Sequence, residues 1–300
     1  MLDFRPLTPE DSSWLRPVLN RTPDLCCECS PTCMMIWGDA SIAQCGDFFV
    51  PMVTYGGRST YLRPLGGGDF APILPEILAD SRERGIFFQM YGITPPVREY
   101  LEKLNQFVFC AERDNFDYIY TVDALATLSG HKYQSKRNHI NRFEEEHPDW
   151  TCEVITRENL PECVRMTTEW YYEHYETGAD PASFDGERRA LALAFDHYDD
   201  LGFDGLLLRV DGRVIAYSMG VPITDTVYDV NFEKAFSSIQ GAYALINREF
   251  SRMVQKKYPS LQYLNREDDM GAEGLRKAKL SYHPAVILEK YRAFLKETAQ

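Results

Sequence analysis

Three consecutive strand patterns followed by a helix pattern constrain the fold of this chain more than any other feature. DGLLLRV (204–210) and RVIAYSMGVP (213–222) are apolar runs separated only by Asp211-Gly212, and Asp-Gly between two such runs predicts a two-residue β-hairpin. A third run, DTVYDVNFEKA (225–235), follows, and Gln240–Lys257 has the apolar spacing of a helix. We therefore predict a mixed α/β fold for this half of the chain.

The order of the predicted elements repeats along the chain. The second half reads β, α, α, β, β, β, α, β, α, β, and its other elements are a strand (151–156), helices (158–175 and 185–198), a strand (261–265), a helix (271–280) and a closing strand (285–294). The first half has a looser version of this order, with a helix, three strands, a helix, a strand, a helix and further strands. A similar order twice over predicts a duplicated fold.

A charged, helical stretch separates the halves. It runs from Asp123 to His147 as DALATLSGHKYQSKRNHINRFEEEH, and Pro148 follows it directly. Proline disfavours helix in the residue before it, so the helix ends here. We expect domains at 1–147 and 148–300, the first idle and the second carrying the active site.

Composition excludes several classes of protein. The chain has 300 residues, 44% of them hydrophobic, and no apolar stretch long enough to cross a bilayer. Its N-terminus, MLDFRPLTPEDSSW, lacks the apolar core of a secretory signal, so we expect a cytoplasmic protein without an integral membrane segment. The net charge of −13 argues against a general nucleic-acid binder, although a local basic patch stays compatible with it.

Four of the eight cysteines cluster as Cys26, Cys27, Cys29 and Cys33. Their spacing differs from the paired C-x2-C of zinc sites, and no histidine is near. We expect reduced thiols packed as small apolar groups and no metal. A metal or redox role for the cluster is the alternative.

Three stretches resemble a known family. They are LATLSGHKYQSKRNHINRFEEEHP, IQGAYALINREF and YLNREDDMGAEGLRKAKLSYHP. Together with the element order, they are similar to the C-terminal domain of phosphatidylglycerol lysyltransferase. That family is a tandem arrangement of the GNAT acyl-CoA N-acyltransferase fold, akin to the Fem-type aminoacyltransferases, which use aminoacyl-tRNA. The resemblance covers essentially the whole chain.

The strand at 227–234 carries the first candidate residues. Strict alternation puts Val227, Asp229, Asn231 and Glu233 on one face. The resemblance implies that this strand separates from the next one, with Glu233 near the reacting amine as a proton acceptor and with Asp229 and Asn231 as substrate-binding groups. The alternative is a strand face solvated by water.

A glycine turn opens the next helix, in SSIQGAYALINREF. Free N–H groups at a helix N-terminus bind phosphate well. The resemblance implies that this turn, with Ser238, Gly241, Ala242 and Tyr243, holds the phosphates of the acyl donor. Compared with the GNAT pattern, serine replaces Gln or Arg and one glycine is lacking. The alternative is a helix start whose glycine permits tight packing.

Polar residues also gather between the strand at 261–265 and the helix at 271–280. Asn265, Glu267, Asp268 and Asp269 follow one another, and Asp268 or Asp269 can cap the helix. Arg276 and Lys279 are three residues apart and share a helix face. We expect Glu267 and Asp268 to be catalytic and the other four, Asn265, Asp269, Arg276 and Lys279, to bind substrate; the alternative is a salt-bridged surface helix. The resemblance implies that Tyr282 is a general acid.

The stretch from His131 to Arg142 has basic residues and no acid. Its Lys136 and Arg137 are candidates for contact with substrate phosphates, including those of tRNA. The alternative is a solvated helix whose basic residues pair with Glu144–Glu146.

The resemblance, together with these patterns, implies an acyl- or aminoacyltransferase that forms no covalent enzyme intermediate and holds no tightly bound cofactor. Acyl-CoA or aminoacyl-tRNA is the co-substrate, so tRNA is one expected partner, and a small molecule or lipid headgroup with an amine or hydroxyl is the acceptor. The alternative is a non-catalytic tandem module that binds or senses a ligand.

Overall fold

A computed structural model describes residues 1–22, 26–176 and 184–296, and its contacts divide the chain into two units. The first unit comprises Met1–Tyr118, Glu267–Lys277 and Val286–Gln300. The second comprises Ile119–Arg266 and Ala278–Ala285. The division therefore falls at residue 118 and not at the expected 147, because the strand and helices from Ile119 to Glu146 pack within the second unit.

The first sheet has seven strands in the order β1-β2-β3-β4-β5-β14-β6. They are β1 (Arg5–Pro6), β2 (Asp39–Cys45), β3 (Phe48–Tyr55), β4 (Arg58–Leu62), β5 (Gln89–Ile93), β6 (Phe107–Ala111) and β14 (Tyr291–Leu295). β4 and β5 are parallel, and the other neighbouring strands of this sheet pair in antiparallel fashion.

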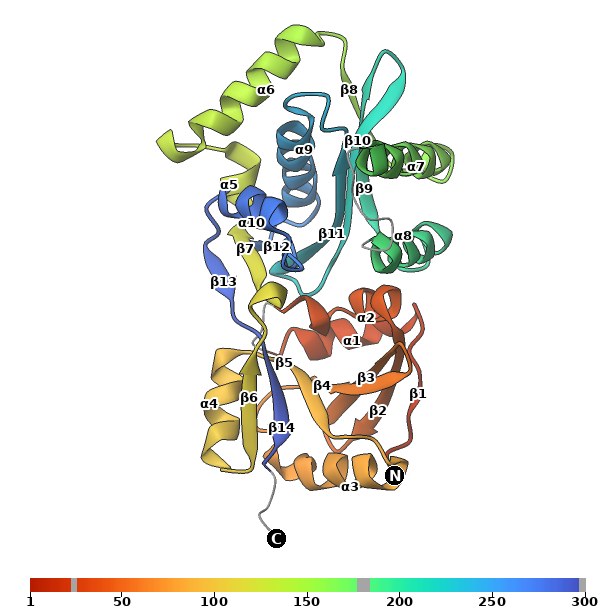
Figure 1. Cartoon of the computed structure of the whole chain (residues 1–300), viewed down its shortest axis with the longest axis vertical. Coiled ribbons are helices and arrows are strands. Elements are labelled where there is room, and N and C mark those ends of the chain that lie inside the picture. The colour runs from red at the N-terminus through yellow and green to blue at the C-terminus, as the bar shows by residue number, and fades with distance from the viewer. Residues whose placement is uncertain (23–25, 177–183, 297–300) are drawn as a thin grey trace. The chain divides into compact units, whose positions relative to one another are not determined.

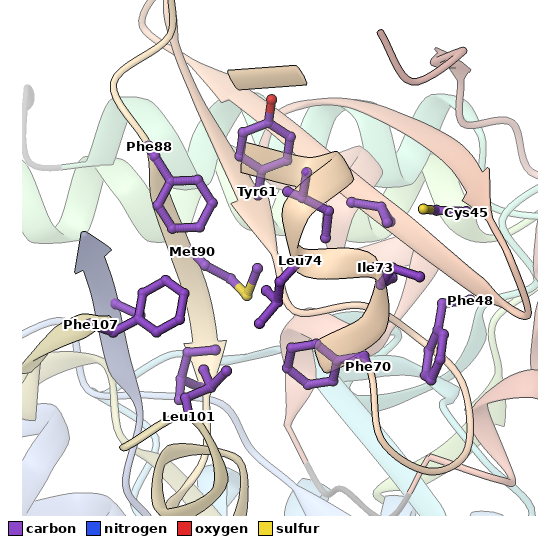
Figure 2. Close-up of a cluster of buried hydrophobic side chains, with 14 of the residues drawn as sticks. Cys45, Phe48, Tyr61, Phe70, Ile73, Leu74, Phe88, Met90, Leu101 and Phe107 are labelled. Carbon is purple, nitrogen blue, oxygen red and sulfur yellow. The ribbon is translucent and has the colours of Figure 1, made fainter. Parts of the chain in front are cut away.

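Helices of the first unit cover this sheet and enclose an apolar core. They are α1 (Asp11–Leu19), α2 (Pro31–Trp37), α3 (Leu74–Arg84) and α4 (Pro95–Lys103), with short 3-10 turns at Cys27–Cys29, Ala71–Ile73 and Arg113–Asn115. Figure 2 shows Leu74 of α3 and Leu101 of α4 pointing toward Met90 of β5. Burial of these side chains is the main stabilising term for the unit.

The second sheet also has seven strands, in the order β13-β7-β12-β11-β10-β9-β8. They are β7 (Asp117–Thr121), β8 (Thr151–Val154), β9 (Asp204–Val210), β10 (Arg213–Pro222), β11 (Val227–Ala235), β12 (Tyr263–Asn265) and β13 (Val286–Leu288). Asp211 and Gly212 join β9 to β10, which confirms the predicted hairpin. β11 and β12 form the parallel pair of this sheet.

Helices flank both faces of the second sheet (Figure 1). They are α5 (Val122–Thr127), α6 (Gln134–Glu146), α7 (Leu160–Glu176), α8 (Asp185–Asp196) and α9 (Ala242–Lys257), with a 3-10 turn at His131–Tyr133, while α10 (Glu273–Leu280) spans the division between the units. The helical stretch predicted at 123–147 is interrupted after α5, because Leu128 and Gly130 adopt positive φ values of 48° and 87°. In the described part of the chain, no helix combines the length and apolar character needed to span a membrane.

The two sheets repeat one arrangement, and the mixed α/β prediction is confirmed. Each has a parallel pair in the middle, followed by an antiparallel strand from elsewhere in the chain: β14 in the first sheet and β7 in the second. The single strand predicted at 285–294 is therefore wrong. It is two strands that belong to different sheets, β13 and β14, and Glu289 and Lys290 connect them.

Candidate active site

β11 and β12 separate after a short parallel pairing. The register joins Val227–Asp229 to Tyr263–Asn265, and β12 ends there, whereas β11 continues to Ala235. We call Val230–Ala235 the open segment of β11. Its backbone still pairs with β10 on the other side, so the side chains that it carries are held by one neighbouring strand and by the helices.

A β-bulge changes which side chains of β11 share a face. Between two paired positions, β10 advances two residues (Val221 to Met219) while β11 advances three (Asp229 to Phe232). As a result, Tyr228 and Glu233 both contact α9, and Lys234 contacts α7. The predicted alternation is therefore wrong beyond the bulge, which re-aims Glu233.

Glu233 is a buried carboxylate with two partners. Arg266, the residue after β12, donates from Nη2 to its Oε1 at 2.8 Å, and Asn247 of α9 donates from Nδ2 to its Oε2 at 3.0 Å. The side chains of Glu233 and Arg266 are only 10% and 11% exposed. Arg266 Nη1 and Asn247 Oδ1 are buried and have no protein hydrogen-bond partner, so a donor and an acceptor remain available beside Glu233.

Aromatic and basic side chains surround Arg266. Its guanidinium carbon lies 5.0 Å from the centroid of the Tyr282 ring and 5.6 Å from that of Tyr120. The Lys136 ammonium lies 3.9 Å from the Tyr282 centroid, and Lys279 Nζ donates to the Arg266 carbonyl oxygen at 2.6 Å. The structure thus brings together four predicted residues, Glu233, Tyr282, Lys136 and Lys279.

Burial sets the protonation of this group. Burial raises the pKa of the Tyr282 hydroxyl well above its usual value. Burial and the positive charge of Arg266 lower the pKa of Lys136 to about 8, against an opposing effect of Glu233. Tyr282 therefore stays protonated, and Lys136 is partly neutral near physiological pH.

The other basic residues of α6 have structural partners. Arg137 donates to the carbonyl oxygens of Leu128 and Gly130, where α5 ends. Arg142 pairs with Glu146 at 2.7 Å, as the alternative of a salt-bridged helix anticipated. Of the two predicted phosphate contacts, Lys136 lies beside Glu233 and Arg266, and Arg137 caps the end of α5.

Gly241 at the start of α9 lies against α6. Its φ is 92°, and a Cβ there would come within 2.4 Å of the His139 carbonyl oxygen. A side chain is therefore excluded, which agrees with the alternative of a glycine for tight packing. Ala242 is buried, and the Tyr243 hydroxyl accepts a hydrogen bond from Trp170 Nε1 at 3.2 Å.

A pocket of about 310 Å³ lies next to this turn. Ser237 and Ser238 line it together with Glu173, His174 and Glu176 of α7. Two carboxylates beside the pocket disfavour a diphosphate, because like charges repel.

Asp269 belongs to the first unit and is fully buried. It accepts hydrogen bonds from Arg276 Nε at 2.9 Å, Tyr118 at 2.5 Å and Arg113 at 3.2 Å. Burial alone would raise its pKa, but Arg276 and the other donors hold that pKa far below the usual range. Asp269 thus anchors Arg276 and does not cap α10, whose first residue is Glu273.

The remaining predicted residues lie near turns or are buried in strands. Asp268 accepts from the Met270 N–H at 3.0 Å, and the Glu267 carbonyl oxygen accepts from the Tyr118 N–H at 3.1 Å. Asp229 and Asn265 are fully buried neighbours in the parallel pair, and Asn231 donates to Asp229 at 3.0 Å. Burial contradicts the alternative of a solvated strand face.

Sequence reasoning missed a buried polar cluster in the first unit. The Lys290 ammonium lies 2.5 Å from Glu28 and 2.7 Å from Asp117, and the side chains of Lys290 and Asp117 are both 0% exposed. Cys26 Sγ and oxygens of Glu28 and Asp117 lie within 4.8 Å of one another, a spacing that could hold a metal ion, but the Lys290 ammonium contacts both carboxylates. No motif joins residues 28, 117 and 290, so only the fold reveals the cluster.

Sequence reasoning also missed Arg266 and Asn247. Arg266 adjoins the predicted acidic run, and Asn247 is a polar residue on the buried face of α9, which is apolar apart from Asn247 and Ser251. Asn247 could have been found from the sequence, because an amide on a buried helix face requires hydrogen-bond partners.

Comparisons with known proteins give the chain a family and a fold. The family model described as phosphatidylglycerol lysyltransferase, C-terminal, matches residues 24–294. A conserved protein of unknown function from Bacteroides thetaiotaomicron is 37% identical; the match covers 99% of this chain and 100% of that one, with a TM-score of 0.92. An uncharacterized protein of Mycoplasmoides gallisepticum is 26% identical over 58% of this chain, which spans about half (54%) of that relative's length.

More distant solved structures agree on the fold. L-PGS from Bacillus licheniformis is 19% identical with a TM-score of 0.67, over 98% of this chain and 94% of that one. A tandem GNAT protein from the clavulanic acid biosynthesis pathway is 9% identical with a TM-score of 0.53, over 100% of both chains. The prediction of two tandem GNAT-like domains is confirmed.

Proposed function

The chain belongs to the family of the phosphatidylglycerol lysyltransferase C-terminal domain, and from this premise we propose that it transfers an aminoacyl group from aminoacyl-tRNA to a hydroxyl or amine acceptor. Membership and fold support an acyltransferase-like protein. The donor, the acceptor and the residues involved are part of the proposal.

The observation that carries the proposal is the Glu233–Arg266 pair at the open segment of β11. Burying two charges costs free energy unless they are paired and fully hydrogen-bonded. Here Arg266 Nη1 and Asn247 Oδ1 have no protein partner. Buried groups of this kind call for a partner, and we propose that the ligand supplies the missing hydrogen bonds.

Each residue has a role in this proposal. The Glu233 carboxylate holds the α-amino group of the aminoacyl moiety, since a carboxylate attracts a cation. Arg266 Nη1 donates to the carbonyl oxygen of the ester, where negative charge develops during transfer. Because Arg266 already neutralises Glu233, we assign Glu233 to positioning and no longer to proton removal.

The surroundings of α9 favour aminoacyl-tRNA over acyl-CoA as the donor. In the described residues near its N-terminus, Gly241 packs on His139 and the adjacent pocket carries Glu173 and Glu176. Both features weaken the case for a diphosphate at this turn. Acyl-CoA therefore serves as the comparison donor in the test.

The test is transfer of a labelled group by the purified protein. Radiolabelled aminoacyl-tRNAs, with lysyl-tRNA first, are supplied with vesicles containing phosphatidylglycerol or with small amines, and acetyl-CoA replaces the tRNA in parallel reactions. We expect label in the acceptor with aminoacyl-tRNA only. Glu233→Gln should lower the rate about 100-fold, whereas Glu146→Gln, in an exposed pair on α6, should leave the rate unchanged.

Other outcomes would change the proposal. Transfer from acetyl-CoA alone would make the protein an acyl-CoA transferase. Binding of a donor without turnover would identify a ligand-binding module.

A further inference from the structure

We propose that Lys136 is the general base of the transfer, taking the proton of the attacking hydroxyl or amine. This inference rests on the function proposed above and deepens it. It gives a chemical task to a side chain that the sequence pattern assigned to phosphate binding.

Glu233 is already engaged by protein donors and by an ion pair. Both of its oxygens accept hydrogen bonds, one from Arg266 and one from Asn247. A proton on Glu233 would weaken the ion pair and leave the buried Arg266 charge uncompensated. Under the proposed function, we therefore assign the proton to a different group near the open segment of β11.

Lys136 is fixed in place by a hydrogen bond whose direction can be determined. The Ser281 hydroxyl donates to the Ala278 carbonyl oxygen at 2.6 Å, so its oxygen must accept from Lys136 Nζ in their 2.7 Å contact. A neutral amine keeps that donated bond and still has a lone pair. The Tyr282 ring, 3.9 Å away, packs against Lys136 Nζ on one side; this contact favours the charged form and opposes the effects of burial and Arg266.

The charges around Lys136 favour its neutral form. Arg266 repels the ammonium, Glu233 attracts it, and Tyr282 remains uncharged because burial raises its pKa. The effects of burial and of Arg266 are larger than that of Glu233, so the pKa of Lys136 falls to about 8. Neutral amine is then available near physiological pH, as general-base catalysis requires.

Lys234 and Lys290 differ from Lys136 in having carboxylate partners, although burial lowers the pKa of Lys234 as well. Lys234 pairs with Glu187 at 2.7 Å, and Lys290 pairs with Glu28 and Asp117. Within residues 1–22, 26–176 and 184–296, no carboxylate lies within ion-pair distance of Lys136. An unpaired, half-buried lysine beside a buried arginine loses charge more readily than it binds an anion.

The proposed step balances in atoms and charge. The oxygen or nitrogen of the acceptor attacks the ester carbonyl carbon and forms the new bond, while Lys136 takes the proton. The bond from that carbon to the ribose oxygen of the tRNA then breaks. The leaving oxygen takes the proton from the Lys136 ammonium, which returns to the neutral amine.

The first experiment measures the amine directly and needs no substrate. Trace labelling of the whole protein with acetic anhydride from pH 6 to 11, read by peptide mass spectrometry, gives the midpoint of Lys136 reactivity. Lys132, an exposed residue of the same stretch, is the internal reference for how the labelling rate of an ordinary lysine changes with pH. We expect the Lys136 midpoint near pH 8; a midpoint above pH 10 would overturn the proposal.

The second experiment uses the transfer assay. Lys136→Arg keeps length and charge but stays protonated, so we expect kcat to fall about 100-fold, with KM within about twofold and the rise in rate near pH 8 lost. Added ethylamine should restore part of the rate of Lys136→Ala, and Lys132→Arg should behave as wild type.

The two proposals fail in different ways. A Lys136→Arg variant that keeps the wild-type rate and pH profile overturns the base assignment alone. Absence of transfer by the wild-type protein with every donor overturns the proposed function, and the task of Lys136 with it.

Discussion

Lys290 in the first unit and Lys136 in the second each lie near the parallel strand pair of their own sheet, in opposite surroundings. Lys290 is fully buried beside β5, where Gly92 leaves room for Cys26 and Glu28, and it contacts two carboxylates. Lys136 is partly exposed and lies close to Arg266, the residue that follows β12. Among the charged groups around Lys136, Arg266 has the strongest effect on its pKa.

The pKa values of the two lysines shift in opposite directions. Burial alone would lower the pKa of Lys290, but Asp117 and Glu28 hold it well above the usual value. Burial and Arg266 lower the pKa of Lys136. The same sheet arrangement thus contains a charge that stabilises the fold and a charge that opposes it, and under our proposal only the second of these serves chemistry.

The largest expected effect is loss of the Lys290 charge. Lys290→Met keeps much of the volume but leaves Glu28 and Asp117 buried without a cation, which should lower the free energy of unfolding by about 3–5 kcal/mol. Urea unfolding measures the loss, and peptide-resolved hydrogen exchange should locate it in the first unit.

Lys277→Met is the matched control for Lys290. Lys277 is 73% exposed and pairs with Glu273 on one helix, so its loss should cost about 0.5 kcal/mol or less. Equal losses of unfolding free energy in Lys290→Met and Lys277→Met would mean that Glu28 and Asp117 are neutralised by protonation. Lys290 would then not be a stabilising charge.

The pH dependence of stability at Asp269 provides a second test of the first unit. The fold lowers the pKa of Asp269 below its value in the unfolded chain, which is near 4. Its contribution to the free energy of unfolding is therefore complete above about pH 4 and disappears as the pH falls below that value. Asp269→Asn should cost about 2–3 kcal/mol at pH 7 and flatten the loss of stability between about pH 4 and 2, as thermal unfolding across pH would show. Asp268→Asn, at the adjacent turn, should change both quantities little.

Gly241→Ala tests whether close packing of α9 on α6 positions the second site. A Cβ at Gly241 would meet the His139 backbone, and the new residue would have to adopt the positive φ of this position. We therefore expect the free energy of unfolding to fall by about 2–3 kcal/mol. Gly212→Ala, with φ of 75° and no neighbour within 4 Å, should cost about 1 kcal/mol. Equal losses would mean that α9 shifts to accommodate the methyl group.

The sequence predicted the parts of this molecule that depend on local patterns. The hairpin at Asp211-Gly212, the helix after Gly241 and the repeated element order follow from turn chemistry and hydrophobic spacing. The bulge in β11 left no such signal, because it depends on pairing with β10. The sequence pattern therefore placed Glu233 on the wrong face of the strand.

Long-range partners were beyond the reach of sequence patterns. Lys290 contacts residues 262 and 173 positions away, and the exchange of β7 and β14 between sheets assembles such pairs. Lys136 was a candidate because of its charge, whereas its lowered pKa comes from burial and from Arg266, which lies far from it in sequence.

The smallest expected effect is a gain in stability from Lys136→Met. A lysine whose pKa is lowered in the fold is destabilising wherever it is charged in both states, so the wild-type protein should become relatively more stable as the pH rises from about 8 to 10.5. Removing the charge should add about 1 kcal/mol at pH 7, after discounting for partial exposure, and the gain should vanish above about pH 10.5. Urea unfolding at pH 7 and 10.5 measures both values. A loss of stability at pH 7 would mean that the contact with the Tyr282 ring outweighs burial, and Lys136 would then resemble Lys290 as a stabilising charge.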